Sequence, residues 1–415
     1  MTKEIVIIGG GIIGLCSAYY LHKEGHQVTI VDQSPMDAGA SYVNAGYLTP
    51  SHIIPLAAPG MMKKGIKWMF DPSSPLYIKP RLNAHFLQWS WAFNKSCTPK
   101  NVEKCIPAIR DINLFSRDLF TDIKHQEGFK FQLERKGLLM LCQTNEMLEE
   151  EIEVGHLAKN AGLPVKELSK EELHKLEPNV KINAKGAVLY ECDAHTTPNV
   201  FMEEMKSYLK NAGVIFHKNE KIEDISLTNG KITSISSSNA TYKADEFVLA
   251  AGSWSKLLSK KLGIKLLLEG GKGYRINAKR ELGITTPAIL AEAKVAVTPM
   301  QGFTRFAGTM EVAGINHDIN PVRVNAIANA ANQYYPEVKI TEAEKSNVAC
   351  GLRPVSPDGM AYIGKSGKCS NLTIATGHAM MGWSIGPATG KLVSEIISDR
   401  KTSLDLNIYH PDRKF

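Results

Sequence analysis

The 415-residue sequence contains no long, uncharged hydrophobic run. A helix that spans a membrane needs about 18–20 consecutive apolar residues. The nearest candidate, residues 5–21, is interrupted by four glycines and lacks the small-residue cleavage site of a signal peptide. The sequence therefore predicts no membrane-spanning segment.

Cysteine and histidine pairs are also missing. The seven cysteines are scattered without a C-x-x-C pair, and the twelve histidines form no metal-binding pair. This usage predicts a reduced, intracellular protein without a metal site. The apolar fraction of 43% and the charged fraction of 22% lie near globular averages, which excludes a disordered, collagen-like or coiled-coil chain.

Acidic residues are scarce in one stretch of the chain. Residues 60–110 hold nine Lys or Arg residues and two acidic ones, an excess equal to the formal net charge of +7 of the whole chain. Three of the five tryptophans, Trp68, Trp89 and Trp91, lie in the same stretch. A net charge this modest gives no reason to expect a nucleic-acid partner.

The N-terminus opens with an apolar, β-branched segment, residues 4–8, that is typical of a buried strand. It breaks at three consecutive glycines and continues with helical spacing over residues 12–24, up to Gly25. A second strand over residues 27–31 closes on Asp32. This βαβ unit predicts a parallel sheet and the α/β fold class.

The rest of the chain mixes helices and strands. A capping box beginning at Ser169 marks one helix start. The spacing predicts helices at 102–123, 146–161, 198–212, 253–262 and 386–397, and strands at 131–141, 214–216, 246–252, 273–276, 304–312 and 372–376, with a hairpin over 222–235 turned at Asn229-Gly230.

The first chemical motif is Gly9-x-Gly11-x-x-Gly14, placed between a strand and a helix. These glycines permit a tight turn, the approach of a pyrophosphate to the backbone, and close helix–strand packing. The helix N-terminus offers free N–H groups to phosphates, and Asp32 is placed to accept from ribose hydroxyls. The motif predicts a dinucleotide, either NAD or FAD. The alternative is a glycine-rich turn in which Asp32 is a surface cap.

Further motifs occur along the chain: ASYVNAG (40–46), VLAAGSWS (248–255), GLRPVSPDGMAYIG (351–364), TGH (376–378) and GWSIGPATG (382–390). On these residues the chain resembles the D-amino-acid oxidase/dehydrogenase superfamily of flavoproteins. Within it the similarity is greatest to the bacterial D-amino-acid dehydrogenase branch, with glycine oxidase and sarcosine oxidase as relatives. The resemblance extends over essentially the full length.

The resemblance implies a glutathione-reductase-type, Rossmann-like FAD-binding domain interrupted by an α+β substrate domain with a mixed or antiparallel sheet. We assign residues 1–58, 190–264 and 346–415 to the FAD domain, and residues 59–189 and 265–345 to the substrate domain. Besides the N-terminal motif, the residues expected to contact FAD are Ser41, Asn44, Ala45, Gly46, Gly252, Gly377, His378, Gly382, Trp383 and Ser384. No attachment sequence surrounds Cys350 and no histidine stands at position 44, so FAD is expected to be non-covalent.

Arg353 is the residue expected to hold a substrate carboxylate, because a planar guanidinium suits bidentate pairing. The alternative is a structural arginine paired with Asp358. Tyr274 is a second candidate, as a hydroxyl over the flavin face, with a core tyrosine as its alternative. Met380 and Met381 are expected to form a soft, apolar wall of the side-chain pocket, and packing in the core is their alternative.

The resemblance implies an enzyme that oxidatively deaminates a D-amino acid to a 2-oxo acid and ammonia, with transfer of the Cα hydride to flavin N5. The nearest alternative is a dehydrogenase or oxidase of D-hydroxyproline or another secondary amine, of the glycine or sarcosine type. An NAD-dependent dehydrogenase and a non-catalytic nucleotide-binding sensor are further alternatives. The sequence leaves open the exact amino acid, the oligomeric state, and whether oxygen or a quinone reoxidises the flavin.

The basic segment at 60–110 gives a last expectation. Lysines beside tryptophans, with the apolar Ile66, Met69 and Phe70, are typical of a surface that binds anionic membranes. We expect a cytoplasmic protein, and the hypothesis is a peripheral contact with the cytoplasmic face of the inner membrane, where a quinone accepts electrons. The alternative is that the tryptophans pack inside the substrate domain beneath a solvated lysine face.

Overall fold

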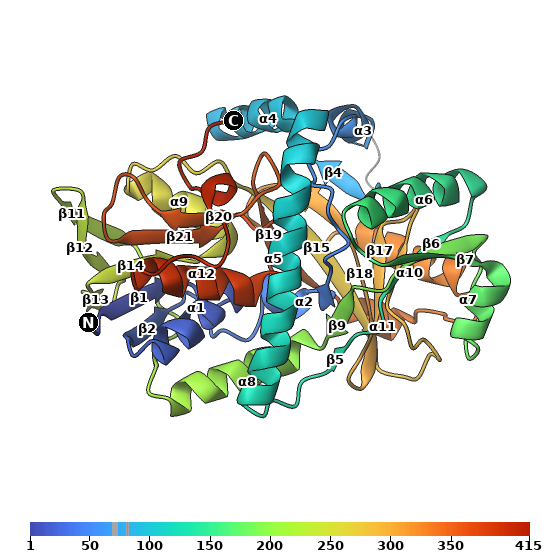
Figure 1. Ribbon diagram of the computed structural model, residues 1–415, viewed down its shortest axis with the longest axis horizontal. Helices are drawn as coiled ribbons and strands as arrows, with labels where there is room; N and C mark the ends of the chain where they lie inside the picture. Colours follow the sequence, from blue (N-terminus) through green and yellow to red (C-terminus); the bar gives the residue numbers. More distant parts are fainter. Residues whose placement is uncertain (69–73, 80, 82) are drawn as a thin grey trace.

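The computed structural model describes residues 1–68, 74–79, 81 and 83–415, apart from the side chains of residues 64, 66 and 67. Two sheets dominate the fold, one in each half of the molecule in Figure 1. The α/β fold class predicted from the sequence is confirmed.

The first sheet has six strands in the order β10-β2-β1-β14-β21-β20. The first five strands are parallel, and β20 is antiparallel to β21. A helix layer covers one face, and a small sheet with α9 covers the other. The strands are β1 (Glu4–Ile8), β2 (Gln27–Val31), β10 (Ile215–His217), β14 (Glu246–Leu249), β20 (Tyr362–Lys365) and β21 (Leu372–Thr376). The covering elements are α1 (Ile12–Lys23), α8 (Pro198–Asn211) and α12 (Gly386–Ile397) on one side, and β11 (Asp224–Thr228), β12 (Lys231–Ser236), β13 (Thr241–Tyr242), η1 (Gly252–Trp254) and α9 (Ser255–Lys261) on the other.

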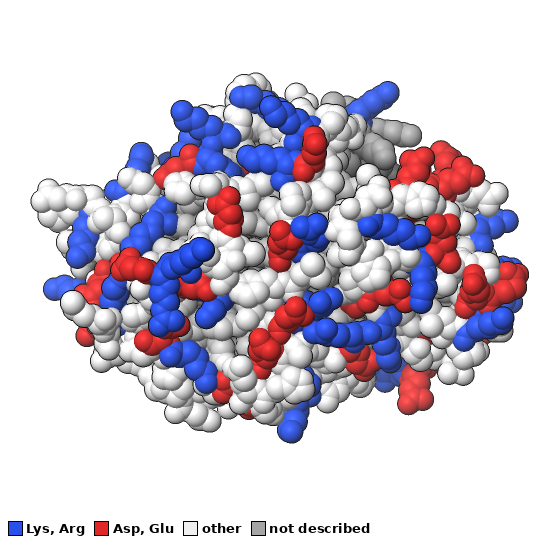
Figure 2. All heavy atoms as spheres, viewed as in Figure 1, with Lys and Arg blue, Asp and Glu red and all other residues white. Residues whose placement is uncertain are grey.

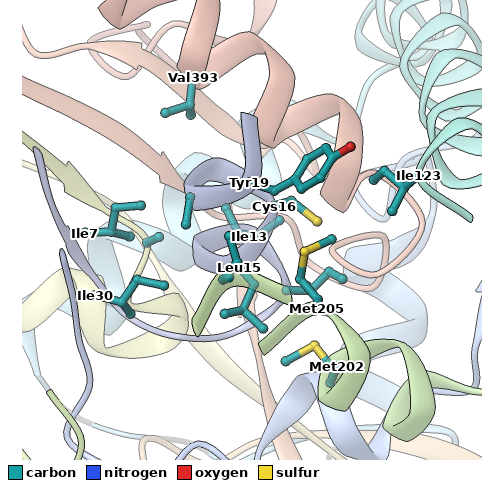
Figure 3. Close-up of a cluster of buried hydrophobic side chains, with 14 of the residues drawn as sticks. Ile7, Ile13, Leu15, Cys16, Tyr19, Ile30, Ile123, Met202, Met205 and Val393 are labelled. Carbon is teal, nitrogen blue, oxygen red and sulfur yellow. The ribbon is translucent and has the colours of Figure 1, made fainter. Parts of the chain in front are cut away.

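Strand β1 is apolar on both faces because the sheet is covered on both. Ile5 and Ile7 belong to the core under the helix layer, whereas Val6 and Ile8 belong to the core on the opposite face. Figure 3 shows the first core, where the α1 side chains lie between Ile7 and Ile30 on one side and Met202 and Met205 of α8 on the other. A continuous apolar run is therefore what this position in the sheet requires.

The second sheet has nine mixed strands, eight of them in the order β19-β15-β18-β17-β16-β6-β8-β7, with β4 also paired to β18. Its strands are β4 (Leu76–Ile78), β6 (Leu138–Cys142), β7 (Val165–Ser169), β8 (Gly186–Tyr190), β15 (Glu269–Ala278), β16 (Ala288–Leu290), β17 (Val295–Met300), β18 (Phe303–Val312) and β19 (Ala349–Val355). Helices associated with this half are α6 (Asn145–Asn160), α7 (Lys170–Leu176), α10 (Pro321–Tyr334) and α11 (Glu342–Ser346). Helix α10 packs its apolar side onto β15 and β18.

Some of the remaining elements lie between the two halves. The 28-residue helix α5 (Pro99–Gln126) crosses between the two halves (Figure 1) and contacts α12. A three-stranded sheet in the order β3-β9-β5 lies near the junction. The other elements are α2 (Ala40–Val43), β3 (Tyr47–Leu48), α3 (Met61–Trp68), α4 (Ala84–Ser96), β5 (Leu133–Glu134), β9 (Ala194–Thr196) and η2 (Asn407–Tyr409).

Most elements predicted from the sequence are present, including the capping box between Ser169 and Glu172 and the hairpin turn at Asn229-Gly230. One prediction was wrong: residues 131–141 form two strands rather than one. They are β5 and β6, which belong to different sheets, and Gly137 between them adopts a φ of 76° that breaks the strand.

The predicted domain ranges can be set beside the two sheets. All six strands of the first sheet lie within 1–58, 190–264 and 346–415. Strand β19 also lies within the last of these ranges but pairs with β15 in the second sheet. This strand carries Arg353, so the arginine belongs to the sheet of the expected substrate domain.

Candidate active site

A cavity of about 740 Å³ extends from the turn between β1 and α1 to the edge of the second sheet at β15 and β19. Its volume lies in the range of ligand pockets, roughly 300–1,000 Å³. Ten of the predicted site residues lie on its wall: Gly9, Gly11, Asp32, Ser41, Asn44, Gly252, Arg353, His378, Gly382 and Trp383. Six do not: Gly14, Ala45, Gly46, Tyr274, Gly377 and Ser384.

The three glycines of the N-terminal motif differ in what surrounds them. Gly9 has a φ of 111°, and a Cβ there would lie 2.5 Å from the Ala250 carbonyl oxygen. A Cβ at Gly14 would lie 1.9 Å from the Gly9 carbonyl oxygen, so this glycine serves helix–strand packing. A Cβ at Gly11 would meet only the Ser41 hydroxyl, at 3.3 Å. Only Gly11 therefore leaves space that opens on the cavity, and a pyrophosphate needs that space.

Asp32 lies on the cavity wall and also orders the turn beside it. One carboxylate oxygen accepts from the Gly10 N–H at 2.6 Å. The other accepts from the Ser34 N–H at 2.7 Å and the Ser34 hydroxyl at 2.6 Å. The carboxylate is thus held at the end of β2, where a ribose contact was predicted.

The 40–46 motif divides between the cavity and its support. Ser41 lies on the wall, and its hydroxyl accepts from the Ile12 N–H in the first turn of α1 at 3.0 Å. Asn44 also lines the cavity, and its Oδ1 accepts from the Gly46 N–H at 2.8 Å. Ala45 and Gly46 lie behind it, and their carbonyls accept from Thr298 and Thr196. Ala45 and Gly46 therefore support the cavity wall but do not line the cavity.

The C-terminal motif divides in the same way. His378, Gly382 and Trp383 face the cavity. The buried His378 ring pairs its Nε2 with the Thr389 hydroxyl at 3.1 Å, and burial lowers its pKa to about 3. Ser384 instead donates to the Asn113 side chain and accepts from the Thr49 N–H.

Arg353 is the cation at the opposite end of the cavity. Its guanidinium lies against Gly273, where a Cβ would come within 2.2 Å of Nη1. Nη1 donates to the Thr309 carbonyl at 3.0 Å, and burial lowers the pKa of Arg353 to about 10, so it stays charged at neutral pH. Within the described residues, no carboxylate lies within 4.0 Å of it. The alternative that paired it with Asp358 is wrong, because Arg413 holds Asp358 at 2.7 and 3.0 Å.

Tyr274 lies in the hydrophobic core, which is the alternative stated for it above. Its side chain is 1% exposed and packs in the core beneath α10. Its hydroxyl donates to the Glu311 carboxylate at 2.6 Å. Neighbouring strand residues point to opposite faces, and it is Gly273 that faces the cavity.

Two aromatic residues on the cavity wall, Trp254 and His317, were not predicted from the sequence as site residues. The rings of Trp254 and His317 stack at 5.8 Å, so they bridge the first sheet's side of the cavity and the loop after β18. Trp254 stands in the 248–255 motif, which could have identified it. No sequence signal marks His317. Met380 lines the cavity as predicted, whereas Met381 packs in a core and accepts from the Asn113 amide.

The described part of the chain contains no cluster of three or more metal-ligating side chains. The cavity instead suits a phosphate-bearing cofactor at one end and an anion at the other. Open backbone at Gly11 and the α1 N-terminus face the first end, and the partly buried Arg353 faces the second.

The family model for FAD-dependent oxidoreductases, abbreviated DAO, matches residues 4–396. The chain therefore belongs to the DAO family of FAD-dependent oxidoreductases and is an enzyme. It is 30% identical to a D-amino acid dehydrogenase from Allorhizobium ampelinum, covering 97% of this chain and 96% of that protein. It is also 30% identical to a D-amino acid dehydrogenase from Bradyrhizobium diazoefficiens, covering 99% and 98%.

Solved structures share the fold. Glycine oxidase from Geobacillus kaustophilus superimposes with a TM-score of 0.80 at 21% identity, covering 100% of this chain and 99% of that one. L-Proline dehydrogenase from P. horikoshii superimposes with a TM-score of 0.73 at 18% identity, covering 99% and 97%. At these identities the likeness concerns the fold alone.

Proposed function

We propose that this chain oxidatively deaminates a D-amino acid to a 2-oxo acid and ammonia, with FAD bound non-covalently. The observation that carries the proposal is a charged Arg353 on the wall of the cavity that begins at the dinucleotide motif. The names of the relatives favour a D-amino acid over an L-amino acid or a secondary amine. When bound, FAD supplies the oxidising power and takes up the Cα hydride.

The chain's own contribution is to hold and orient the substrate. A carboxylate on Arg353 forms a charge-assisted pair in a site with few competing partners, which fixes the position of Cα. His378 is unsuited to act as a base, because burial lowers its pKa to about 3, which makes it a weak proton acceptor, and its Nε2 faces Thr389. The positioning of Cα therefore accounts for the protein's part in the reaction.

The cysteines near the cavity support non-covalent attachment by giving no nucleophile for a thioether. No cysteine of the described residues lies on its wall. Cys350, next to β19's arginine motif, turns its thiol to the His317 carbonyl at 3.5 Å, and burial raises its pKa above the ordinary value. A thiol in this state is a poor nucleophile.

The test is an anaerobic bleaching screen of the purified yellow protein. The panel comprises D- and L-amino acids, glycine, sarcosine and the hydroxyprolines. We expect loss of the oxidised-flavin absorbance with one or more D-amino acids and slower loss with their L-enantiomers. Faster bleaching by sarcosine or a hydroxyproline would replace the proposal with a secondary-amine enzyme. No bleaching by any compound would favour a nucleotide-binding sensor.

We also propose that the protein binds an anionic membrane surface through α4, where a quinone reoxidises the flavin. Leu87 and Trp91, one helical turn apart, are 54% and 64% exposed, and the Lys95 ammonium lies 5.1 Å from the Trp91 ring centroid. Lys and Arg side chains gather over α4 and the start of α5 in Figure 2. No helix among the described residues is long and apolar enough to cross a membrane.

The two other tryptophans of the basic segment do not form this face. Trp89 is 3% exposed and donates its Nε1–H to the Val355 carbonyl at 2.9 Å, as the core-packing alternative predicted. Trp68 is half-buried against the same core. Met69 and Phe70 lie outside the described residues, as do the side chains of Lys64, Ile66 and Lys67.

Co-sedimentation with liposomes tests the membrane proposal. We expect binding to anionic vesicles at low salt, little binding at high salt, and loss of binding in Leu87→Ser/Trp91→Ser and in Lys95→Glu. Leu157→Ser, an exposed leucine on α6, is the control that should bind like the wild type. Absent binding at low salt, or equal binding by all variants, would contradict the proposal.

A further inference from the structure

Strand β18 contains a bulge directly opposite Gly273. Tyr274 of β15 pairs with Gly308, and Lys272 pairs with Glu311. One residue of β15, Gly273, therefore faces two residues of β18, Thr309 and Met310. Bulges redirect the backbone and are common beside active sites.

Thr309 in this bulge has an unusual backbone conformation. Its φ is 60°, in the left-handed region. A β-branched residue rarely adopts this region, because its Cβ substituents crowd the backbone. Such a conformation persists only where the surroundings impose it, and these residues concentrate at functional sites.

The consequence is that the Thr309 carbonyl is directed at the substrate anchor. Its oxygen accepts the Arg353 Nη1–H at 3.0 Å. Gly273 leaves space for the guanidinium on one side, and the Thr309 carbonyl fixes one of its N–H groups. The orientation of the remaining N–H groups toward the cavity thus depends on the bulge.

A second, fully buried arginine holds the bulge from the other side. Arg323 of α10 is 0% exposed, and its Nε donates to the Thr309 hydroxyl at 3.3 Å. Its Nη2 donates to the Met310 carbonyl at 3.2 Å and to the Ser74 carbonyl at 2.9 Å. The buried cation therefore engages both residues of the bulge.

We propose that Thr309 and Arg323 are positioning residues that act through Arg353: the clamp on the bulge sets the guanidinium orientation that recognises a substrate carboxylate. The proposal deepens the proposed function and rests on it for the identity of the ligand. It predicts that weakening the clamp impairs carboxylate recognition while leaving FAD binding intact.

The experiment compares three variants of the holoenzyme. Thr309→Val removes the hydroxyl and keeps the β-branch, Thr309→Ser keeps the hydroxyl, and Thr304→Val is a control five residues earlier on the same strand. For Thr309→Val we expect KM for a D-amino acid to rise roughly tenfold with kcat within about twofold of wild type, since ground-state and transition-state binding are lost together. Thr309→Ser and Thr304→Val should resemble the wild type, and flavin content should be equal in all four proteins.

A second readout separates carboxylate recognition from general damage and from turnover. The flavin absorbance change is titrated with propionate and with propionamide, which differ in the carboxylate alone. We expect the wild type to prefer propionate, and Thr309→Val to lose most of that preference. If no D-amino acid reduces the wild type but this preference still falls in Thr309→Val, the proposed function fails and the inference stands. Equal KM values and equal preference in Thr309→Val and Thr304→Val would overturn the inference.

Discussion

The two ends of the cavity present different chemistry to a ligand. At the β1–α1 end the wall consists of backbone, with Gly9 and Gly11 before the open turn of a helix and Asp32 nearby. At the β15–β19 end the wall carries one partly buried cation, Arg353, in a space left by Gly273. The first end suits phosphates and ribose, and the second suits a small carboxylate.

The two ends also differ in how far apart their residues lie in the sequence. The first is assembled mainly within a single βαβ unit, where strand, glycines and acid follow at short, fixed spacing. The second joins β15, β18 and β19 across a mixed sheet, and its geometry depends on the bulge at Thr309. Local spacing can reveal the first kind of site, whereas tertiary pairing creates the second.

The largest effect is expected at the cofactor end. Gly11→Val should abolish retention of FAD, because its side chain would fill the space that the pyrophosphate needs. A Cβ at Gly11 meets nothing nearer than the Ser41 hydroxyl at 3.3 Å, so the unloaded protein should still fold. Flavin-to-protein ratios after dialysis measure retention, and far-UV circular dichroism checks folding. Equal flavin in wild type and variant would refute this placement of the cofactor.

The matching change at the substrate end is Gly273→Ala. The new Cβ would come within 2.2–2.4 Å of the Arg353 guanidinium, which must move. We expect kcat/KM to fall roughly tenfold to a hundredfold, about 1.4–2.7 kcal/mol, with unchanged flavin content. Gly270→Ala is the control on the same strand, since its Cβ would lie 3.4 Å from the nearest atom, the Gly314 carbonyl oxygen. Equal kcat/KM in both variants would show that the position of Arg353 does not matter.

A smaller effect concerns His378, which lies on the cavity wall. Its pKa is lowered to about 3 in the folded protein, whereas an unfolded histidine titrates near 6.5. As the pH is lowered, the unfolded chain therefore takes up this proton at a higher pH than the folded protein does. The free energy of unfolding is highest above pH 6.5 and decreases as the pH drops toward 3. The free energy of unfolding decreases by at most about 1.4 kcal/mol per pH unit for each such histidine. Buried His195, with a pKa lowered to about 4, adds to this pH dependence.

Urea unfolding at pH 7.5, 6 and 5 measures this dependence. His378→Gln should lower the free energy of unfolding at pH 7.5. Between pH 6 and 5 this free energy should decrease less in the variant than in the wild type. His410→Gln, at an exposed position, is the control and should keep the slope of the wild type. An unchanged slope in His378→Gln would mean that His378 takes up its proton equally in both states.

The smallest effect is expected for Asp32→Ala. The variant loses a ribose acceptor and the contacts that order Gly10 and Ser34. We expect FAD to dissociate with a Kd raised roughly tenfold, about 1.4 kcal/mol, rather than to be lost altogether. Asp37→Ala, an exposed neighbour that is absent from the cavity wall, should bind FAD like the wild type. A loss as complete as that of Gly11→Val would make Asp32 part of the turn rather than a ribose contact.

The contrast between local spacing and tertiary pairing explains how much of the fold and of the site could be predicted from the sequence. Gly9, Gly11, Gly14 and Asp32 lie at positions that their local spacing implied, and so does the hairpin at Asn229-Gly230. Arg353 was found through family resemblance, because nothing local distinguishes it from an arginine paired with Asp358. Only the C-terminal segment, which places Arg413 on Asp358, separates the two alternatives.

The remaining misplacements have the same origin. Whether Tyr274 or Gly273 faces the cavity depends on the register of β15 against β18 and β19, which the sequence does not contain. Trp89 and Trp91 are two residues apart on α4, yet one packs against Val355 and the other faces solvent. His317 reaches the cavity only because the loop after β18 returns to Trp254.

The central claim is that Arg353 anchors the carboxylate of a D-amino acid beside the flavin. The most direct measurement is the rate of anaerobic flavin bleaching by a D-amino acid in wild type and Arg353→Leu loaded with equal FAD. We predict that kred/Kd for the variant falls at least roughly a hundredfold, about 2.7 kcal/mol, because an unpaired carboxylate is then buried. Near-equal values in the two proteins would contradict the account, since the carboxylate would then be held elsewhere.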